Sequence, residues 1–338
     1  MLDKTIRETV CDLLIIGTRV DQHIDYVLQY IPEEVKYCRL NIDEYPLITD
    51  ISFSLEQSKT PEIIIKAQEE IFDISKVKVV WFRRIGAPTI DQRIEKKAHR
   101  VFALGEVEAA IFNLAYLLSE AQWISPFEST KRASSKLYQL KIAGECGLNF
   151  PETLVTNSVN LAGKFLSSSK PILYKTLLSP SVIYDNSRSL IFSHLLDEKD
   201  INLLYQVQYV PCQFQKYAEK AYELRITFTG NSFHTVKINS QINVDAKIDW
   251  RAVGLNELTY EIIPLPTEIE DKLRLLLKKL DLNYGAIDMI VTPNGEYVFL
   301  EVNPHGAWGW LEKALDLSIS QSLAHHICSF ISGENISD

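Results

Sequence analysis

The sequence has few cysteines and no closely spaced cysteine pair, and this excludes two classes of small-domain protein. A disulfide framework or a structural zinc site needs cysteines in pairs or at short, regular spacing. The five cysteines are an odd and widely scattered set without any C-x-x-C: Cys11, Cys38, Cys146, Cys212 and Cys328. Scattered, unpaired thiols are typical of a reducing compartment. We therefore expect a cytoplasmic protein with free cysteines.

Long hydrophobic runs and excess positive charge are also missing. The apolar run Leu13 to Ile16 is far too short to span a bilayer, and the amino terminus has no signal-peptide pattern. The chain has 35 Lys and Arg against 44 Asp and Glu, which gives a net charge of −9. Nucleic-acid-binding proteins usually carry an excess of positive charge. The sequence thus predicts neither a membrane nor a nucleic acid as partner.

Three familiar catalytic or phosphate-binding motifs are absent. Only Gly17 follows the first predicted strand, Asp12 to Gly17, so the G-x-G-x-x-G fingerprint is missing. Neither G-x-x-x-x-G-K-[ST] nor G-x-S-x-G occurs, which leaves P-loop and hydrolase interpretations without support. If the protein binds a nucleotide, it must do so outside the first domain and by other groups.

The chain is long enough for two or three domains with full cores, since 46% of its 338 residues are hydrophobic. Strands and a helix alternate over the first ~120 residues, which indicates a small α/β domain. A helix-like stretch from 91 to 120 carries one apolar stripe, which we expect to pack on the sheet. The stripe consists of Ile94, Ala98, Val101, Phe102, Ala109, Phe112 and Tyr116.

The rest of the chain also mixes strands and helices. Strands are predicted at 170–178 and 205–217, and a hairpin at 222–239 turns at Gly230-Asn231. Thr267 and Glu270 match the capping-box pattern, which predicts the start of a leucine-rich helix. We expect an α/β protein with domains at 1–122, 123–210 and 211–338.

The most informative stretch is GAIDMIVTPNGEYVFLEVNP at 285–304. An Asn-Gly pair between two apolar runs predicts a two-residue hairpin turn, which places Asp288 opposite Glu301. Asn303 follows two residues later and shares their face. Opposed carboxylates repel unless a cation lies between them, and oxygen ligands without Cys or His favour magnesium. The sequence predicts a magnesium site made by Asp288, Glu301 and Asn303.

The alternative is a solvated hairpin face with chance acids. The predicted register places Ile290 and Phe299 on the same face as the two carboxylates. Large apolar side chains are more often covered than solvated, so these neighbours favour a buried site.

Two lysines are candidates for binding phosphate. Lys175 lies in the middle of an apolar strand, where a buried ammonium needs an anion, and a nucleotide phosphate would serve. The alternative is a lysine that snorkels from an edge strand. Lys136 lies on an otherwise polar helix face, where most lysines are simply solvated.

Glu223 and Arg225 alternate on one strand and can point into one cleft. The carboxylate suits ribose hydroxyls, and the guanidinium suits a phosphate or an oxyanion. A surface cross-strand pair is the alternative, and the same ambiguity holds for Lys237 and Asn239 on the partner strand. The segment 213–217, QFQKY, could offer backbone groups to an adenine edge.

Arg83 and Arg84 end the last strand of the first domain. The carboxyl ends of strands in open α/β sheets form ligand crevices, so these arginines are candidates for substrate contacts. We expect one of the two to be structural.

Taken together, these residues resemble the ATP-grasp ligases. The resemblance is carried, in chain order, by Lys136, Phe150-Pro151-x-Thr153, Lys175, 213–217, Glu223-x-Arg225, Asp288 and Glu301-x-Asn303. The phrases WFRR, ELRITFTG, INSQIN followed by DWR, and LNYGAIDMIVTP are similar to peptide ligases that macrocyclise ribosomally made peptides of the microviridin, plesiocin and thuringinin type. The resemblance covers Asp12 to Ser329 and implies an ATP-grasp fold preceded by a Rossmann-like pre-ATP-grasp domain.

The resemblance implies an ADP-forming ligase. ATP would phosphorylate an Asp or Glu side chain of a precursor peptide, and a Thr or Ser hydroxyl, or a Lys amine, would then attack the acyl phosphate. The product would be an ω-ester or ω-amide ring, with the ester favoured, and two Mg²⁺ ions would assist. It further implies that Lys136 and Lys175 contact phosphates. The other implied roles are an adenine hinge at Gln215, Lys216 and Tyr217, a ribose contact at Glu223, and catalysis by Arg225, Lys237 and Asn239.

The resemblance also implies a two-part peptide site. A helical leader would lie on the central domain near Asp197, Glu198 and Asp200, while Arg83 and Arg84 would attract an acidic core peptide. We also expect a homodimer.

Two features depart from the family pattern. Lys216 stands where the hinge commonly has an acidic residue, and the segment LLSPSVIYDNS has no glycine, so Ser179 or Ser181 would replace the usual glycine-rich lid. The competing functions are a ligase that extends a protein tail or joins small metabolites, and a non-catalytic nucleotide-binding regulator.

Overall fold

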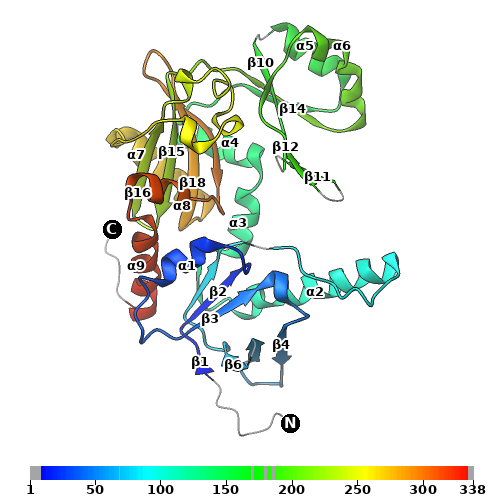
Figure 1. The fold of residues 1–338 in the computed structure, drawn as a ribbon, viewed down its shortest axis with the longest axis vertical. Helices are drawn as coiled ribbons and strands as arrows, with labels where there is room; N and C mark the ends of the chain where they lie inside the picture. The colour runs from blue at the N-terminus through cyan, green and yellow to red at the C-terminus, as the bar shows by residue number, and fades with distance from the viewer. Residues whose placement is uncertain are drawn as a thin grey trace.

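The structure is a computed structural model that describes residues 9–67, 69–84, 86–168, 171–178, 181–184 and 187–333. Ser179 lies outside these residues, as does the side chain of Ser181, so the predicted serine lid falls outside the description. Figure 1 shows an amino-terminal α/β part at one end, a five-stranded sheet beside it, and a smaller central part beyond. No helix in the described ranges is both long and apolar enough to cross a membrane.

The amino-terminal part is built on a parallel sheet with the order β3-β2-β7-β8. Its strands are β2 (Leu13–Gly17), β3 (Tyr37–Asn41), β7 (Val79–Phe82) and β8 (Gln122–Ile124). β2 is buried along its whole length, as expected for a parallel strand covered on both faces. One face packs on α1 (Gln22–Leu28) and α9 (Ile319–Ser332), and the other on α2 (Lys97–Leu117).

A second sheet in this part was not predicted. Its order is β1-β6-β5-β4, and its strands are β1 (Thr9–Val10), β4 (Thr49–Ser54), β5 (Glu62–Ala67) and β6 (Glu70–Asp73). The α/β class of the domain is confirmed, and this sheet extends it.

α2 packs on the sheet as predicted, but not through the predicted stripe. Val107, Ile111 and Leu114 face the sheet, whereas Phe102 and Tyr116 are 69% and 61% exposed. The helix has apolar side chains on two sides, so periodicity identified a stripe without indicating which one meets the core. Figure 1 shows α2 extending away from the rest of the molecule.

The central part contains a small antiparallel sheet with the order β13-β10-β14-β9. Its strands are β9 (Thr153–Thr156), β10 (Ile172–Lys175), β13 (His194–Leu195) and β14 (Cys212–Lys216). α5 (Val159–Ser168) packs on it through Ala162 and Leu166. The hairpin β11 (Ser181–Tyr184) and β12 (Ser187–Leu190) and helix α6 (Glu198–Asn202) complete this part.

The strand predicted at 205–217 is shorter than expected, because Leu204–Tyr209 form a 3₁₀ helix. β8 begins at the predicted domain boundary 122/123 and pairs with β7, and β14 begins just after the predicted boundary 210/211 and pairs with β10. Each of these strands therefore belongs to the sheet of the part that precedes its boundary.

The third part is a five-stranded sheet with the order β17-β16-β15-β18-β19. The strands are β15 (Tyr222–Thr229), β16 (Ser232–Ile238), β17 (Tyr260–Ile262), β18 (Tyr284–Val291) and β19 (Tyr297–Asn303). One face packs on α4 (Lys136–Glu145) and α7 (Thr267–Leu280), which bury a large apolar core. The predicted hairpin turn at Gly230 is confirmed, with φ of +68° at that glycine.

The β18–β19 hairpin pairs Asp288 with Glu301 as predicted, but by a different route. The amide of Thr292 donates to the carbonyl of Glu296, so the loop has three residues rather than two. This shifts the register near the turn by one, and an irregularity after Asp288 shifts it back. Phe299 consequently lies in the apolar core rather than beside the acids, which corrects its predicted position.

Candidate active site

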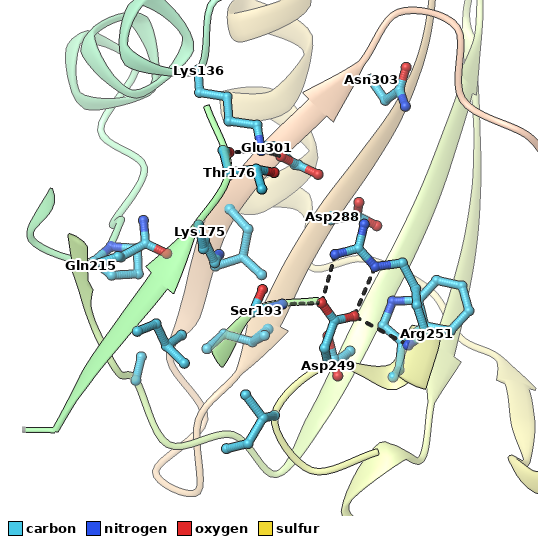
Figure 2. A pocket seen from close by; sticks show the side chains of 18 of the residues that line it. Lys136, Lys175, Thr176, Ser193, Gln215, Asp249, Arg251, Asp288, Glu301 and Asn303 are labelled. Atoms are coloured by element: carbon cyan, nitrogen blue, oxygen red, sulfur yellow. Dashed lines mark hydrogen bonds and ion pairs between the residues drawn. The ribbon is translucent and has the colours of Figure 1, made fainter. Parts of the chain in front are cut away.

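A cleft lies between the central sheet and the five-stranded sheet, and Figure 2 shows the side chains that line it. The open space of the cleft, including its mouth, is about 1350 Å³. The cleft brings together nine residues that the sequence singled out: Lys136, Lys175, Gln215, Lys216, Tyr217, Glu223, Asp288, Glu301 and Asn303.

Asp288 at the floor of this cleft is held by Arg225. The Nη1 group of Arg225 lies 2.9 and 3.0 Å from the two carboxylate oxygens, and its Nη2 donates to the carbonyl of Ala307 at 3.2 Å. Strands β15 and β18 place the two residues directly opposite each other. Burial and the neighbouring Glu301 raise the pKa of Asp288, although Arg225 opposes the shift. Arg225 therefore acts as a buried counter-ion beneath the cleft.

Glu301 faces two lysines instead. The Lys136 ammonium lies 3.2 Å from the Glu301 carboxylate and donates to the carbonyl of Thr176 at 3.0 Å. Burial alone would raise the pKa of Glu301, but the charges of Lys136 and Lys175 outweigh it and hold the pKa below its usual value. Burial lowers the pKa of Lys175, which means that its ammonium lacks full compensation by anions. An anionic ligand at this point would supply that compensation.

Gln139 fixes the helix that carries Lys136. Its side-chain amide donates to the carbonyl of Val302 at 2.8 Å, and its side-chain oxygen accepts from the amide of Val302 at 2.8 Å. These two bonds tie α4 to the edge strand β19 beside Glu301. Gln139 was not predicted, and a glutamine on the buried side of the helix is the signal that could have found it.

The donor set of the predicted metal site fits Mg²⁺. Asp288 and Glu301 are opposed, Asn303 lies two residues further along β19, and all three line the cleft. Three oxygen donors without Cys or His suit a hard cation that completes its shell with water and phosphate. Within the described residues, no group of three or more His, Cys, Asp or Glu could hold a metal by itself. The amide and a bound nucleotide would therefore have to contribute.

Asp249 and Arg251 were not predicted as site residues, although they belong to the phrase DWR. Asp249 accepts from the Arg251 side chain at 2.8 and 2.7 Å and from the amide of Ser193 at 3.0 Å. These bonds outweigh burial and keep the pKa of Asp249 low. In Figure 2 the Arg251 guanidinium lies between Asp249 and Asp288. Neither partner is near in sequence to the hairpin acids, so only the folded chain reveals the cluster.

Glu223 lines the cleft but already has a partner. Lys220 lies 2.7 Å from its carboxylate and also donates to the carbonyl of Ile248 at 3.1 Å. Burial raises the pKa of Glu223, and Lys220 opposes the shift. A ribose contact at Glu223 stays a prediction, and Lys220 is a further basic residue beside it.

The predicted adenine hinge lies at the end of β14. The amides of Lys216 and Tyr217 donate to the carbonyls of Glu152 and Pro171, both at 2.9 Å. The Gln215 side chain donates to Thr153 at 2.9 Å, and its own oxygen has no partner among the described residues. Adenine contacts at this hinge would therefore use carbonyl groups and Gln215 rather than those two amides.

The structure does not bring Lys237 and Asn239 to the cleft. The register of β15 and β16 pairs Lys237 with Leu224, whose side chain lies in the core on the opposite face of the sheet from Arg225. Lys237 contacts the Glu261 carboxylate at 3.2 Å, and the Asn239 amide donates to it at 2.8 Å. Their catalytic assignment is corrected, because strand alternation directs both away from the acids.

The predicted peptide contacts divide into buried and exposed groups. Arg83 is only 2% exposed and contacts the His305 carbonyl and the Trp308 ring, so it is the structural member of its pair, whereas Arg84 is exposed. Asp197 and Asp200 form a capping box at the start of α6, and Asp200 also pairs with His194 at 2.7 Å. Glu198 is exposed on the same helix. Contacts of Arg84, Asp197, Glu198 and Asp200 with a peptide stay predictions.

Comparison with known proteins agrees with this architecture. A family model described as the MvdD pre-ATP grasp domain matches residues 12–131. No curated protein matches the chain. Among solved structures, the chain is similar to a Chryseobacterium gregarium RiPP-associated ATP-grasp ligase in complex with ADP and a leader and core peptide. The identity is 31% and the TM-score 0.87, over 95% of this chain and 97% of that one.

Two further structures are similar. Macrocyclase MdnC from Microcystis aeruginosa MRC, bound with the precursor peptide MdnA, is 30% identical with a TM-score of 0.84, over 94% of this chain and 99% of that one. ATP-grasp ligase PsnB, complexed with minimal precursor, Mg and ADP, is 17% identical with a TM-score of 0.75, over 96% and 99%, and shares the fold. The fold is therefore ATP-grasp with a pre-ATP-grasp domain, and the protein is an ADP-forming ligase. With 31% identity over 95% of its length, the chain belongs to the RiPP-associated ATP-grasp ligases.

Proposed function

We propose that this ligase uses ATP and Mg²⁺ to activate Asp or Glu side chains of a ribosomal precursor peptide as acyl phosphates. A Thr or Ser hydroxyl then closes an ω-ester ring, or a Lys amine closes an ω-amide ring, with the ester favoured. The observation that carries the proposal is the convergence of Lys136, Lys175, Asp288, Glu301 and Asn303 in one cleft. Relatives at 30% identity or more are bound to ADP or to precursor peptides, which supports it.

Lys136 and Lys175 bind the nucleotide phosphates in this proposal. Both ammonium groups lie beside Glu301, and Lys175 is short of anionic partners. Asp288, Glu301 and Asn303 hold two Mg²⁺ ions, which neutralise charge on the transferring phosphoryl group when bound. The carboxylates thus link the metal to the two lysines on the phosphate side.

The two arginines near Asp288 have different tasks. Arg225 is buried and holds the Asp288 carboxylate in place from below, while Arg251 lines the cleft and its side chain is 42% exposed. A guanidinium that faces the reacting groups can stabilise the oxyanion formed when the acyl phosphate is attacked. We therefore extend the oxyanion role, predicted for Arg225, to Arg251. Arg225 supports the site by holding Asp288.

The precursor peptide contacts two regions in this proposal. A helical leader lies on the central domain near α6, and the acidic core peptide enters the cleft. Arg251, which lines the cleft, and Arg84, which lies outside it, offset the net charge of −9. The enzyme acts in the cytoplasm, and the cysteines at 11, 38, 146, 212 and 328 are free.

The homodimer forms through α2 in this proposal. The exposed apolar side chains of α2 follow the alternating spacing of four and three residues that is typical of helix–helix interfaces. They are Ala98, Phe102, Ala109, Phe112 and Tyr116, with Gly105 between them.

Mass spectrometry of acidic candidate precursor peptides incubated with the enzyme and Mg-ATP tests the function. Each ring removes one water, so cyclisation lowers the peptide mass, whereas the addition of amino acids to a tail raises it. A non-catalytic regulator would change neither the peptide mass nor the ADP concentration. Peptides without a leader are the matched control, and a gain of mass would refute the macrocyclase assignment.

A further inference from the structure

The segment 303–309, which begins at the last residue of β19, is held by side chains from the amino-terminal part of the chain. Arg83, which follows β7, donates from Nη1 to the carbonyl of His305 at 2.7 Å. His23 of α1 accepts through Nε2 from the amides of Trp308 and Gly309 at 3.3 and 3.2 Å. Arg83 thus binds this segment near its start, and His23 binds it at its end.

The same loop is held from the five-stranded sheet. The Tyr284 hydroxyl donates to the carbonyl of Gly306 at 2.6 Å, and Arg225 donates to that of Ala307 at 3.2 Å. A Cβ atom on Gly306 would lie 2.9 Å from the Arg225 Nη2 atom, so the loop passes directly against that guanidinium. Every residue from 305 to 309 therefore has at least one backbone group bound by a side chain.

The backbone of His305 connects Arg83 to Asn303, the predicted metal ligand. The amide of His305 donates to the Asn303 side-chain oxygen at 2.9 Å, while its carbonyl accepts from Arg83. The amide of Gly306 donates to the Asn303 backbone carbonyl at 3.1 Å. A shift of the Arg83 guanidinium would therefore move the group that orients the Asn303 oxygen.

Arg83 is itself fixed on several sides. Its Nε lies 3.4 Å from the Asp21 carboxylate, and its guanidinium lies 5.0 Å from the centre of the Trp308 ring. The other Asp21 oxygen accepts from Nδ1 of His23 at 2.7 Å, which leaves Nε2 as the acceptor for the loop amides. Asp21 thus orders both side chains that hold the loop.

None of the described residues before 134 lines the cleft, and the sequence of the amino-terminal part carries neither of the glycine-rich phosphate-binding motifs. We propose that Arg83, supported by Asp21 and His23, is a positioning residue that acts through the backbone of His305 to orient the Asn303 side-chain oxygen for the metal. This inference rests on the proposed metal role of Asn303. It assigns Arg83 a part in the reaction without contact to substrate.

The test measures ADP binding by calorimetry with and without Mg²⁺, using Arg83→Met, Arg83→Lys and the matched control Arg19→Met. Arg19 is an exposed arginine of the same domain. Groups behind a metal ligand typically change metal affinity by about 10- to 100-fold, so Arg83→Met should weaken Mg²⁺-dependent ADP binding at least about tenfold. Metal-free ADP binding should stay unchanged, Arg83→Lys should recover part of the loss, and Arg19→Met should match the parent. Unchanged Mg²⁺-dependent binding in Arg83→Met, or an equal loss without metal, would overturn the proposal.

A double variant separates this inference from the proposed function. If Arg83 acts through Asn303, adding Arg83→Met to Asn303→Ala should cause no further loss of Mg²⁺-dependent binding, and a full additional loss overturns the coupling. Full Mg²⁺-dependent binding by Asn303→Ala alone would refute the metal site and this inference together. If Arg83→Met does not fold, Arg83→Lys and His23→Gln carry the same comparison, because each removes donors or an acceptor from the loop and retains a polar side chain.

Discussion

Replacing Asp288 or Glu301 should abolish metal-dependent chemistry in both cases but should affect folding stability differently. Asp288→Asn leaves the Arg225 guanidinium without its carboxylate, and the two side chains are only 10% and 21% exposed. Removing one partner of a buried ion pair costs about 3 to 5 kcal/mol. Burial and Glu301 disfavour the charge on Asp288, as its raised pKa shows, so a neutral amide regains part of this cost. We therefore expect the lower end of the range, about 3 kcal/mol.

Glu301→Gln should cost much less. The Lys136 and Glu301 side chains are 23% and 30% exposed, and Lys136 keeps its bond to the Thr176 carbonyl. Partly solvated ion pairs contribute about 0.2 to 1 kcal/mol, and the loss of repulsion with Asp288 offsets part of that. The expected difference between the two variants is therefore about 2 kcal/mol.

Thermal unfolding without Mg²⁺ and nucleotide measures this difference. At roughly 2 °C for each kcal/mol in a chain of this size, Asp288→Asn should lower the Tm by about 6 °C and Glu301→Gln by about 2 °C or less. Both variants should lose ring formation. Glu261→Gln is the matched control, because Glu261 pairs with Lys237 away from the cleft. Equal Tm losses, or a larger loss for Glu301→Gln, would refute the assignment of Arg225 as the buried counter-ion.

Three further outcomes are expected. Lys175→Met should weaken ATP binding by roughly 1.5 to 3 kcal/mol in calorimetry, because a charge-assisted bond to phosphate is lost, while stability holds or rises. The pKa of Asp21 is lowered from 3.8 to about 2, because the His23 hydrogen bond and the Arg83 charge outweigh burial. Since the folded pKa lies below the unfolded one, the stabilisation of about 2 kcal/mol is present above pH 3.8 and lost as the pH falls through about 2. Urea unfolding should show that Asp21→Asn removes this acid-dependent part. Phe102→Glu should convert the proposed dimer to a monomer in light scattering, whereas Val20→Glu, at a similarly exposed apolar position, should not.

Each of these predictions has a contradicting result. Unchanged ATP affinity would return Lys175 to a snorkelling role. An acid transition of the same size in Asp21→Asn would assign that transition to other carboxylates. A Phe102→Glu protein that is still a dimer would place the interface elsewhere.

The spacing of residues along the chain predicted which side chains lie opposite each other in the β18–β19 hairpin. Asp288 and Glu301 lie on strands joined by a short turn, and Arg225 lies opposite Asp288 on the neighbouring strand. Side chains alternate with a period of two, so the spacing from a predicted two-residue turn placed the two carboxylates opposite each other. The three-residue loop shifts the register by one, and the irregularity after Asp288 shifts it back. Glu301 lies beyond both shifts and was placed correctly, whereas Phe299 lies between them and was not.

Spacing cannot say which face of an element meets the core. Lys237 alternates as regularly as Arg225, yet β16 directs it to the opposite side of the sheet. Arg83 and Arg84 are adjacent, and Arg83 is the buried one because it packs against Asp21 and the segment at 305–309. Burial of a face depends on contacts between segments more than a hundred residues apart, and a local pattern carries no information about those contacts. The sequence by itself therefore determined the hairpin acids and the family, whereas the tertiary structure alone decided which basic residues reach them.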